Sequence, residues 1–385
     1  MIYLNNAATS WPKPEAVYRT ADQYLRCLTG SPGRGTHEAA LAAGRALLES
    51  RELLADLFGI NEPEKIVFTS NATEALNLAI RGLLKPGDHV ITSSMEHNSV
   101  ARPLFALQTQ GVEVTIIDCA PVGTLDPAAV ERALRPNTRL ICLTHASNVT
   151  GTILPIEEVG AIARRHKVYF MVDAAQTAGE VPLNVEEAGI DLLAFTGHKG
   201  LFGPPGTGGL YLRHPEVVAP LKYGGTGSQS ELLTQPEIMP DKFESGTLNS
   251  PGIAALGAGV KFILETGLEA IRKHTRELTA ILLERLKELP NVTIYGPSDV
   301  AMRVPVISLN IKGISPGEAS AWLAARYDIV TRSGLHCAPL AHKTIGTLET
   351  GTLRLSPGFF NTAEEVEQVI EALRELVREV QKRDS

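Results

Sequence analysis

Short apolar runs alternate with longer amphipathic stretches from about residue 64 to residue 213. Seven such runs occur: "KIVFT" (65–69), "HVITS" (89–93), "VEVTI" (112–116), "RLICLTH" (139–145), "VYFMVD" (168–173), "DLLAFT" (191–196) and "GGLYL" (208–212). Nearly continuous apolar runs are typical of strands that are covered on both faces. The stretches between them, such as 73–84 and 155–166, have helical spacing. This alternation predicts an α/β fold with a mainly parallel sheet.

The pattern changes after Gly224, where "GGTGSQSELLTQPE" shows no periodicity and predicts a loop. Two helical stretches follow, and Thr362 with Glu365 has the spacing of a capping box that starts a last helix. The predicted helices are 250–265 and 268–289, and the predicted strands of a second sheet are 291–296, 304–311, 328–333 and 351–356. We expect a large domain (16–265) and a smaller α+β C-terminal domain (266–385), joined by the N-terminal segment 1–15.

Composition limits the function classes. The chain has 385 residues, with 36 Lys and Arg against 43 Asp and Glu and no basic block, which argues against nucleic acid as a partner. The start "MIYLNNAATSW" shows no signal-peptide pattern, and no apolar run approaches the roughly 20 residues of a membrane span. The four scattered cysteines are typical of free thiols in a reducing compartment. We therefore expect a cytoplasmic protein that is not bound to a membrane.

Polar residues stand where the predicted strands end, which is where ligands bind in open α/β sheets. Lys199 follows the apolar run "DLLAF", and desolvation there favours a neutral amine that can form a Schiff base. Asp173 ends "VYFMV", where a buried carboxylate needs a partner such as a protonated pyridine nitrogen. Each residue also has an ordinary interpretation, because Lys199 could be a surface lysine and Asp173 a helix N-cap.

Two further strand ends fit the same cofactor. In "SNATEALNLAI", free amides at a helix start and the Thr73 hydroxyl could hold a phosphate, although many helix starts look alike. His97 follows another strand and could stack on a planar ring or be an ordinary loop histidine. A phosphate cradle, a histidine, an aspartate and a lysine in this order point to a pyridoxal phosphate site.

These residues resemble the class V group of fold-type I pyridoxal phosphate enzymes, specifically the cysteine desulfurases and selenocysteine lyases with a compact cysteine loop. The likeness runs from "YLNNAAT" to "LRLSPGFFNT", and "VDAAQ", "TGHK" and "RSGLHCA" are its most specific elements. It implies a seven-stranded sheet, a homodimer and pyridoxal 5'-phosphate bound to Lys199. It further implies that His97 stacks on the ring and acts in catalysis by shuttling protons, that Asp173 pairs with the pyridine nitrogen and that Gln176 bonds the ring oxygen.

The resemblance also implies the remaining site residues. The phosphate would be held by Ala72, Thr73, Thr196 and His198, with Thr247 contributed by the neighbouring subunit. The substrate would be bound by Asn148, Arg354, Ala7 and Arg332. Asn148 and Arg354 would position its carboxylate, the latter as a bidentate clamp. The opening segment around Asn6 and Ala7 would fold back over the site.

Cys337 stands where this family has its nucleophile. The implied reaction converts L-cysteine to L-alanine, with Lys199 taking the α-proton and Cys337 retaining the sulfur as a persulfide. Arg332 and His336 would favour the thiolate. Leu335 departs from the His or Gln of many relatives, which leaves the sulfur acceptor and the preference for sulfur or selenium open.

Other interpretations of this region remain. His336, Cys337 and His342 could bind zinc, but no second Cys/His cluster is near in sequence, and we expect no metal. Cys337 could also be a buried structural residue. The protein could be a selenocysteine lyase acting on L-selenocysteine, a class V aminotransferase or lyase that does not use Cys337, or a non-catalytic protein with this fold. Of these functions, only a cysteine desulfurase implies a sulfur-acceptor protein as a partner.

Overall fold

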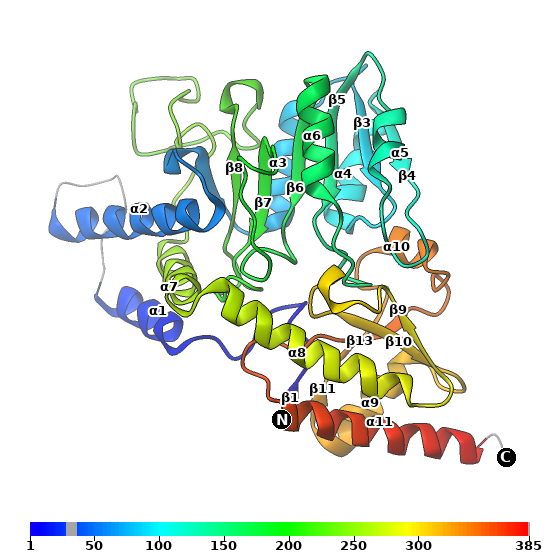
Figure 1. Cartoon of the computed structure of the whole chain (residues 1–385). Helices are drawn as coiled ribbons and strands as arrows, with labels where there is room; N and C mark the ends of the chain where they lie inside the picture. The colour runs from blue at the N-terminus through cyan, green and yellow to red at the C-terminus, as the bar shows by residue number, and fades with distance from the viewer. Residues whose placement is uncertain (28–36, 384–385) are drawn as a thin grey trace.

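The computed structural model describes residues 1–27 and 37–383 and has the expected α/β architecture (Figure 1). The large sheet has seven strands in the order β2-β8-β7-β6-β5-β3-β4. The strands are β2 (Ile66–Thr69), β3 (His89–Ser93), β4 (Glu113–Ile117), β5 (Thr138–Thr144), β6 (Tyr169–Asp173), β7 (Leu192–Thr196) and β8 (Gly208–Leu212). Strand β8 runs antiparallel to both of its neighbours, β2 and β7, and all other neighbouring pairs are parallel, so the predicted seven strands and mainly parallel sheet are confirmed.

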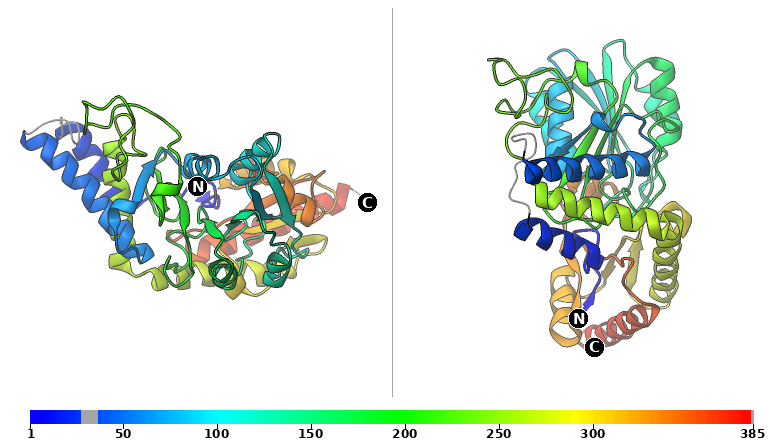
Figure 2. Two further views of the ribbon diagram at one scale, coloured as in Figure 1. Left: turned by 90° about the horizontal axis from the view of Figure 1, so that it is seen from above. Right: turned by 90° about the vertical axis from the view of Figure 1, so that its left-hand side faces the viewer.

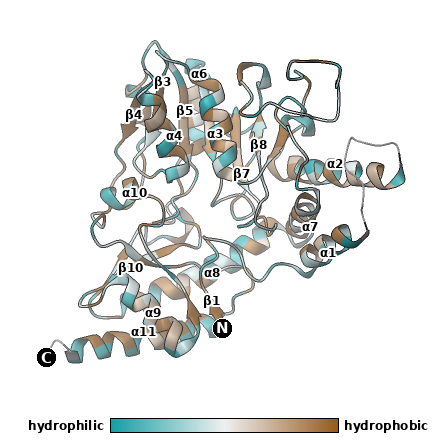
Figure 3. Ribbon diagram, turned by 180° about the vertical axis from the view of Figure 1, so that it is seen from behind, coloured by the Kyte–Doolittle hydropathy of each residue, from teal (hydrophilic) through white to brown (hydrophobic). Residues whose placement is uncertain are grey.

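Alternate residues of the central strands face two separate apolar cores, which explains their continuous apolar sequences. In β5, Leu140 and Cys142 belong to one core, whereas Ile141 and Leu143 belong to the other. The strands accordingly lie between helices and are apolar along their length (Figure 3). Burial on both faces is what separates these runs from the alternating pattern of a half-exposed strand.

Helices cover the sheet and link it to the C-terminal part of the chain. They are α1 (Glu15–Cys27), α2 (Glu38–Phe58), α3 (Ala72–Leu83), α4 (Asn98–Gln108), α5 (Pro127–Arg132), α6 (Ile156–His166), α7 (Ser250–Thr266), α8 (Leu268–Lys287), α9 (Pro316–Tyr327), α10 (Pro339–Thr344) and α11 (Ala363–Arg383). Helix α7 lies between α1 and α2 (Figure 2), and α8 then leads to the second sheet. Thr362 and Glu365 form the reciprocal bonds of the predicted capping box.

The second sheet has four antiparallel strands in the order β12-β13-β10-β9. These are β9 (Val292–Tyr295), β10 (Ile307–Ile311), β12 (Arg332–Gly334) and β13 (Thr352–Leu355). The expected single strand 328–333 is wrong in one respect, because it divides into β11 (Ile329–Val330) and β12. Strand β11 pairs in parallel with the N-terminal β1 (Ile2–Tyr3), which fixes the start of the chain to its C-terminal part.

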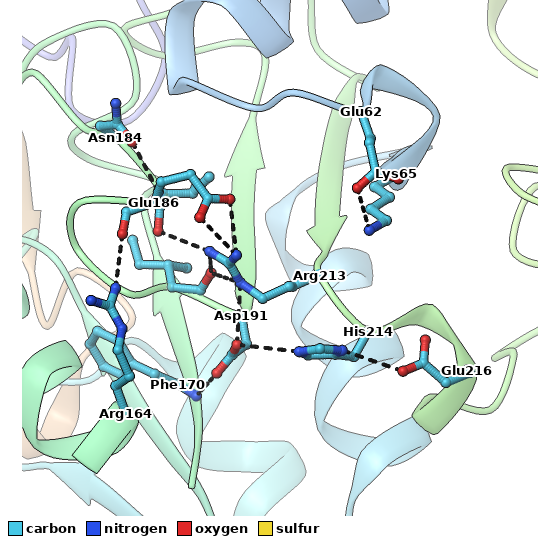
Figure 4. Close-up of polar contacts among 12 residues, drawn as sticks. Glu62, Lys65, Arg164, Phe170, Asn184, Glu186, Asp191, Arg213, His214 and Glu216 are labelled. Carbon is cyan, nitrogen blue, oxygen red and sulfur yellow. Dashed lines mark hydrogen bonds and ion pairs between the residues drawn. The ribbon is translucent and has the colours of Figure 1, made fainter. Parts of the chain in front are cut away.

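An ionic network lies at the end of the large sheet where β6 and β7 begin and β8 ends (Figure 4). Asp191 accepts a bond of 2.9 Å from the Phe170 amide and lies 3.4 Å from Arg213, whose guanidinium also bonds both Glu186 oxygens at 2.9 Å. These contacts join the start of β7 to the start of β6 and the end of β8. In the described part of the chain, no helix has the length and apolar character of a membrane span.

Candidate active site

Lys199 and Asp173 meet at the carboxyl ends of β7 and β6. Asp173 is only 3 % exposed, and burial raises the pKa of its carboxyl group. Its Oδ1 accepts a 2.9 Å bond from the Ala175 amide, so it also caps the turn that follows. Burial lowers the pKa of Lys199 to about 8, against the effect of Asp173, which raises it. A buried anion and an amine that loses its proton near neutral pH thus line one cavity.

The start of α3 and the start of α4 face the same cavity. Asn71 Oδ1 accepts from the Glu74 amide at 2.9 Å, which leaves the first-turn amides of Ala72 and Thr73 for another acceptor. The Thr73 hydroxyl lies 2.8 Å from Ser99 Oγ, and Ser99 Oγ lies 2.9 Å from His97 Nδ1. Burial lowers the pKa of His97 to about 4, so its ring is neutral.

Two arginines, Arg332 and Arg354, also line the cavity. Arg354 is fully buried, and its Nη1 donates to the Asn148 carbonyl at 2.9 Å while its Nη2 donates to Asn5 Oδ1 at 3.3 Å. Its Nε has no hydrogen-bond partner in the described part of the chain. Arg332 is its direct partner across the β12–β13 pair, where like charges repel. Burial lowers the pKa of Arg354 to about 9, and Arg332 adds to the effect.

The N-terminal segment folds over the site, as the opening residues were expected to do. Gln176 Nε2 donates to the Ala7 carbonyl at 3.1 Å, and the Ala7 amide donates to Ser356 Oγ at 3.0 Å. Ser10 donates through its amide to the carbonyl of His198 at 2.9 Å and through its hydroxyl to that of Lys199 at 2.9 Å. The segment therefore holds the backbone on which Lys199 stands.

Cys337 is exposed in a four-residue connection between β12 and α10. The Cys337 carbonyl accepts from the Asn98 amide at 2.8 Å, and the His336 carbonyl accepts from Asn148 Nδ2 at 2.7 Å. Arg332 Nη2 lies 3.5 Å from Cys337 Sγ. The thiol is therefore fixed through its backbone and contacts a guanidinium that lines the cavity.

The expected contribution of His336 to the thiolate is wrong. The ring is buried, its Nε2 lies 3.0 Å from Thr352 Oγ1, and burial lowers its pKa to about 2. A neutral imidazole supplies no positive charge to the neighbouring sulfur, so Arg332 is the cation at this position.

The zinc interpretation of this loop finds no support in the geometry. His342 is buried with its Nδ1 2.7 Å from Thr347 Oγ1, whereas Cys337 is exposed. Within residues 1–27 and 37–383, no three His, Cys, Asp or Glu side chains are close enough to share a metal ion.

The structure brings most of the predicted site residues around one cavity of about 200 Å³. Its lining includes Ala7, Ala72, Thr73, His97, Asn148, Asp173, Gln176, Thr196, His198, Lys199, Arg332 and Arg354. Two predicted residues are not among them. Cys337 lies outside the lining and contacts Arg332, which belongs to it. Thr247 is exposed in the loop before α7 and lines a different hollow, beside α2. Burial, with Lys199 adding to the effect, lowers the pKa of His198 to about 4.

Comparison with known proteins agrees with this arrangement. The sequence matches the class V aminotransferase family over residues 2–369. The chain belongs to that family. Among its relatives, a probable cysteine desulfurase of Methanothermobacter thermautotrophicus is 35% identical, over 97% of this chain and 94% of the relative. Another probable cysteine desulfurase, from Pyrococcus abyssi, is 36% identical over 98% and 94%.

Solved structures of cysteine desulfurases are also similar to this chain. The apo structure of a cysteine desulfurase from Thermococcus onnurineus superposes with a TM-score of 0.93 at 36% identity, covering 98% of this chain and 94% of the other. The cysteine desulfurase CsdA of Escherichia coli superposes with a TM-score of 0.86 at 27% identity, covering 98% and 94%.

The residues present fit the cofactor of class V aminotransferases, pyridoxal phosphate. Asp173 is a buried carboxyl with one oxygen left for a cationic ring nitrogen, and Lys199 is an amine of lowered pKa. The first turn of α3 offers unsatisfied amides for a phosphate. The donor set therefore matches a ring, an aldehyde and a phosphate in the positions that the family requires.

Sequence reasoning missed two residues of the site. Ser99 lies within 2.9 Å of both Thr73 Oγ1 and His97 Nδ1. A signal existed, because an N-cap side chain accepts from the backbone amide two or three residues later, and Ser99 stands two residues after His97. Asn5 contacts Arg354 from 349 residues away, and no local pattern announces such a contact.

Proposed function

We propose that this class V aminotransferase is a cysteine desulfurase that converts L-cysteine to L-alanine and retains the sulfur as a persulfide on Cys337. One observation carries the proposal. Arg332 lines the cavity that holds Lys199 and Asp173, and its Nη2 lies 3.5 Å from the exposed Cys337 sulfur. A nucleophile is thus placed beside a site suited to amino-acid chemistry.

Pyridoxal phosphate, when bound, would hold the substrate amine and withdraw electrons from its Cα. Lys199 would bind the cofactor, Asp173 would face its ring nitrogen and Gln176 its ring oxygen. The ring would stack on His97. Its phosphate would contact the amides of Ala72 and Thr73, with the remaining contacts from Thr196, His198 and the partner's Thr247.

Side chains of this protein would orient the substrate and transfer its protons. Arg354 and Asn148 would orient the substrate carboxylate, which supplies the anion that Arg354 lacks among the described residues. Lys199 Nζ would accept the proton from Cα, as its pKa of about 8 permits near neutral pH. His97, with a neutral ring, would carry a proton between the substrate and Ser99.

Sulfur transfer follows as an exchange of one bond for another. Cys337 Sγ would attack the substrate sulfur, an S–S bond would form, and the Cβ–S bond would break with its electrons moving to Cβ. Protonation of the carbon skeleton then gives L-alanine, and the extra sulfur stays on Cys337. The Arg332 guanidinium would stabilise the anionic sulfur during the exchange.

The test is Cys337→Ala against wild type, with alanine production measured from L-cysteine and from L-selenocysteine. Wild type treated with L-cysteine should gain the mass of one sulfur at Cys337, and dithiothreitol should remove it. The variant should lose alanine formation from L-cysteine. Cys119→Ala is a control, because that thiol is buried and should not carry sulfur.

The same measurements also distinguish a cysteine desulfurase from the alternative enzymes. Partial activity of the variant on L-selenocysteine would favour a selenocysteine lyase, since selenium leaves more easily. Full activity of the variant on L-cysteine, without a persulfide on the wild type, would contradict the proposal and favour an aminotransferase or lyase that does not use Cys337.

The proposal also includes the oligomeric state, the domain division, the sulfur acceptor and the cellular compartment. We infer a homodimer in which Thr247 completes the partner's site, and a large domain (16–265) packed on a small one (266–385). A sulfur-acceptor protein is expected because a persulfide must be discharged before the next turnover. A reducing, cytoplasmic setting suits an enzyme that needs Cys337 as a free thiol.

A further inference from the structure

Two segments that meet at Cys337 carry cations and no carboxylate. Residues 97–112 and 331–348 contain Arg102, Arg332 and Lys343 but neither Asp nor Glu, although the chain has 43 acidic residues against 36 basic ones. Burial lowers the pKa of each of the three histidines in these segments, to about 4 or about 2, so the histidines are neutral. The exposed thiol therefore lies in a positively charged region of an acidic protein.

Arg102 places its charge beside Cys337 but outside the cavity. It lies one turn along α4 from Asn98, whose amide donates to the Cys337 carbonyl at 2.8 Å, so the two residues share a helix face. Arg102 is exposed, makes no hydrogen bond or ion pair within the described part of the chain, and is not among the residues that line the cavity. Its charge still acts on the site, because it helps to lower the pKa of His97. Arg102 can therefore bind a group that approaches Cys337 from solvent.

Lys343 is less suited to this role. It stands in the last turn of α10, and the exposed Asp118 lies on a segment close to that helix. The Cys119 amide and the Thr344 hydroxyl both donate to Ser94 Oγ, at 3.0 and 2.8 Å, which brings the two segments together. The Asp118 carboxylate opposes the positive charge at this end of α10, so Arg102 is the cation to test.

The proposed reaction has a second step that needs an approach from solvent. A thiolate of the acceptor attacks the outer sulfur of the persulfide on Cys337 and forms a new S–S bond with it. The bond between the outer sulfur and Cys337 Sγ breaks, its electron pair stays on Sγ, and the outer sulfur leaves on the acceptor with its proton. Arg332, 3.5 Å from Sγ, stabilises the Cys337 thiolate that remains. The substrate carboxylate is held inside the cavity by Arg354, so Arg102 has no part in binding it.

We propose that the sulfur acceptor is a thiol with negative charge close to its sulfur, and that Arg102 attracts this charge to Cys337. The inference rests on the proposed function and adds the chemical class of its acceptor. Attraction between exposed charges raises the rate of encounter and weakens as salt is added. The negative group belongs either to a small anionic thiol or to a carboxylate beside a cysteine of a partner protein.

The experiment measures how fast thiols of different charge remove the extra sulfur from Cys337. Holoenzyme is loaded with L-cysteine, desalted and checked by mass for one added sulfur. It is then mixed with mercaptoethanesulfonate, 2-mercaptoethanol or cysteamine, which have the same two-carbon chain and are anionic, neutral and cationic. At low ionic strength and equal thiolate concentration, the anionic thiol should react about tenfold faster than the neutral one, and the cationic thiol should be slowest. In about 0.5 M salt the three rates should agree within about threefold.

Variants assign the preference to one side chain. Arg102→Glu should abolish or reverse the preference for the anionic thiol, whereas Arg102→Lys, which keeps the charge, should retain it. Arg378→Glu is the matched control, because Arg378 is also an exposed helical arginine, on α11, away from α4 and α10 (Figure 1). The quantity compared is the ratio of the anionic to the neutral rate. A general change in the reactivity of the persulfide affects both rates and cancels in this ratio.

A peptide with one cysteine between aspartates, compared with the same peptide carrying lysines, separates the two sources of charge. A rate that saturates with the acidic peptide but not with mercaptoethanesulfonate supports a partner protein, and the reverse supports a small thiol. Equal rates for the three thiols would overturn the inference, as would a preference that Arg102→Glu leaves unchanged or that Arg378→Glu alters equally. In those cases a persulfide on the wild type leaves the proposed function standing. If the wild type forms no persulfide, the proposed function fails and the inference falls with it.

Discussion

Cofactor loading should depend on pH through the amine of Lys199. Burial lowers the pKa of this amine from 10.5 to about 8, Asp173 opposes the shift, and Arg354 and Arg332 add to it. The amine reacts with an aldehyde only when neutral, and this form predominates above the pKa. At pH 7 about one molecule in ten carries it, roughly 300-fold more than for an unperturbed lysine. The rate of loading should therefore rise about tenfold per pH unit below pH 8 and level off above.

Two substitutions should move the midpoint in opposite directions. Asp173→Asn removes an anion that raises the Lys199 pKa, so the midpoint should fall. Arg354→Gln removes a cation that lowers it, so the midpoint should rise. The signs distinguish a local electrostatic effect from a general change in stability.

The assay mixes apoprotein with pyridoxal phosphate at fixed pH values and follows the rate at which the cofactor becomes covalently attached and trappable by borohydride. Lys199→Ala should give no trapped adduct and serves as the blank. Because each variant also changes cofactor affinity, the midpoint of the pH profile is compared and not the absolute rate. A wild-type midpoint near 10, or shifts of the same sign in both variants, would refute the electrostatic account.

Two further predictions concern packing and assembly. A Cβ at Gly160 would lie 1.8 Å from the Ala188 carbonyl oxygen, so Gly160→Ala should lower the free energy of unfolding measured in urea by about 3 kcal/mol or more. Gly44 has open space around it, so Gly44→Ala should raise that free energy by up to about 1 kcal/mol. Equal effects of the two substitutions would contradict the clash. If Thr247 completes the partner's site, light scattering should show a dimer, and mixed dimers of Lys199→Ala and Thr247→Ala chains should regain activity that neither parent dimer has; no recovery, or an active monomer, would contradict this.

The sequence predicts well those parts of the fold in which the apolar pattern of a single strand shows how that strand is buried. Leu140 to Leu143 alternate between two cores, so the run is apolar throughout and can be recognised without knowing its neighbours. The positions of Asp173 and Lys199 then follow, because the carboxyl ends of parallel strands share one edge. The helices α1, α2, α9 and α10 were not predicted, and their boundaries depend on packing against distant elements.

The parts that the sequence could not supply depend on contacts between distant residues. The division of 328–333 into two strands arises because β1 pairs with Ile329 and Val330, while β13 pairs with the residues after them. Likewise, His336 looks like a cation beside Cys337 in the sequence, but burial against Thr352 makes it neutral. Local spacing gives the neighbours of a residue along the chain and says nothing of its solvation.

The backbone at Cys337 connects this geometry to the chemistry. His336 and Cys337 have φ angles of +48° and +59°, which cost a residue with a side chain about 1 kcal/mol or more each. The conformation persists because the Asn98 amide and Asn148 Nδ2 bind the two carbonyls of this turn. The turn also keeps Cys337 exposed while its sulfur touches Arg332, which lines the cavity. A thiol held in this way can meet a substrate on one side and remain open to solvent on the other, so a persulfide formed there would be accessible to an acceptor without unfolding of the loop.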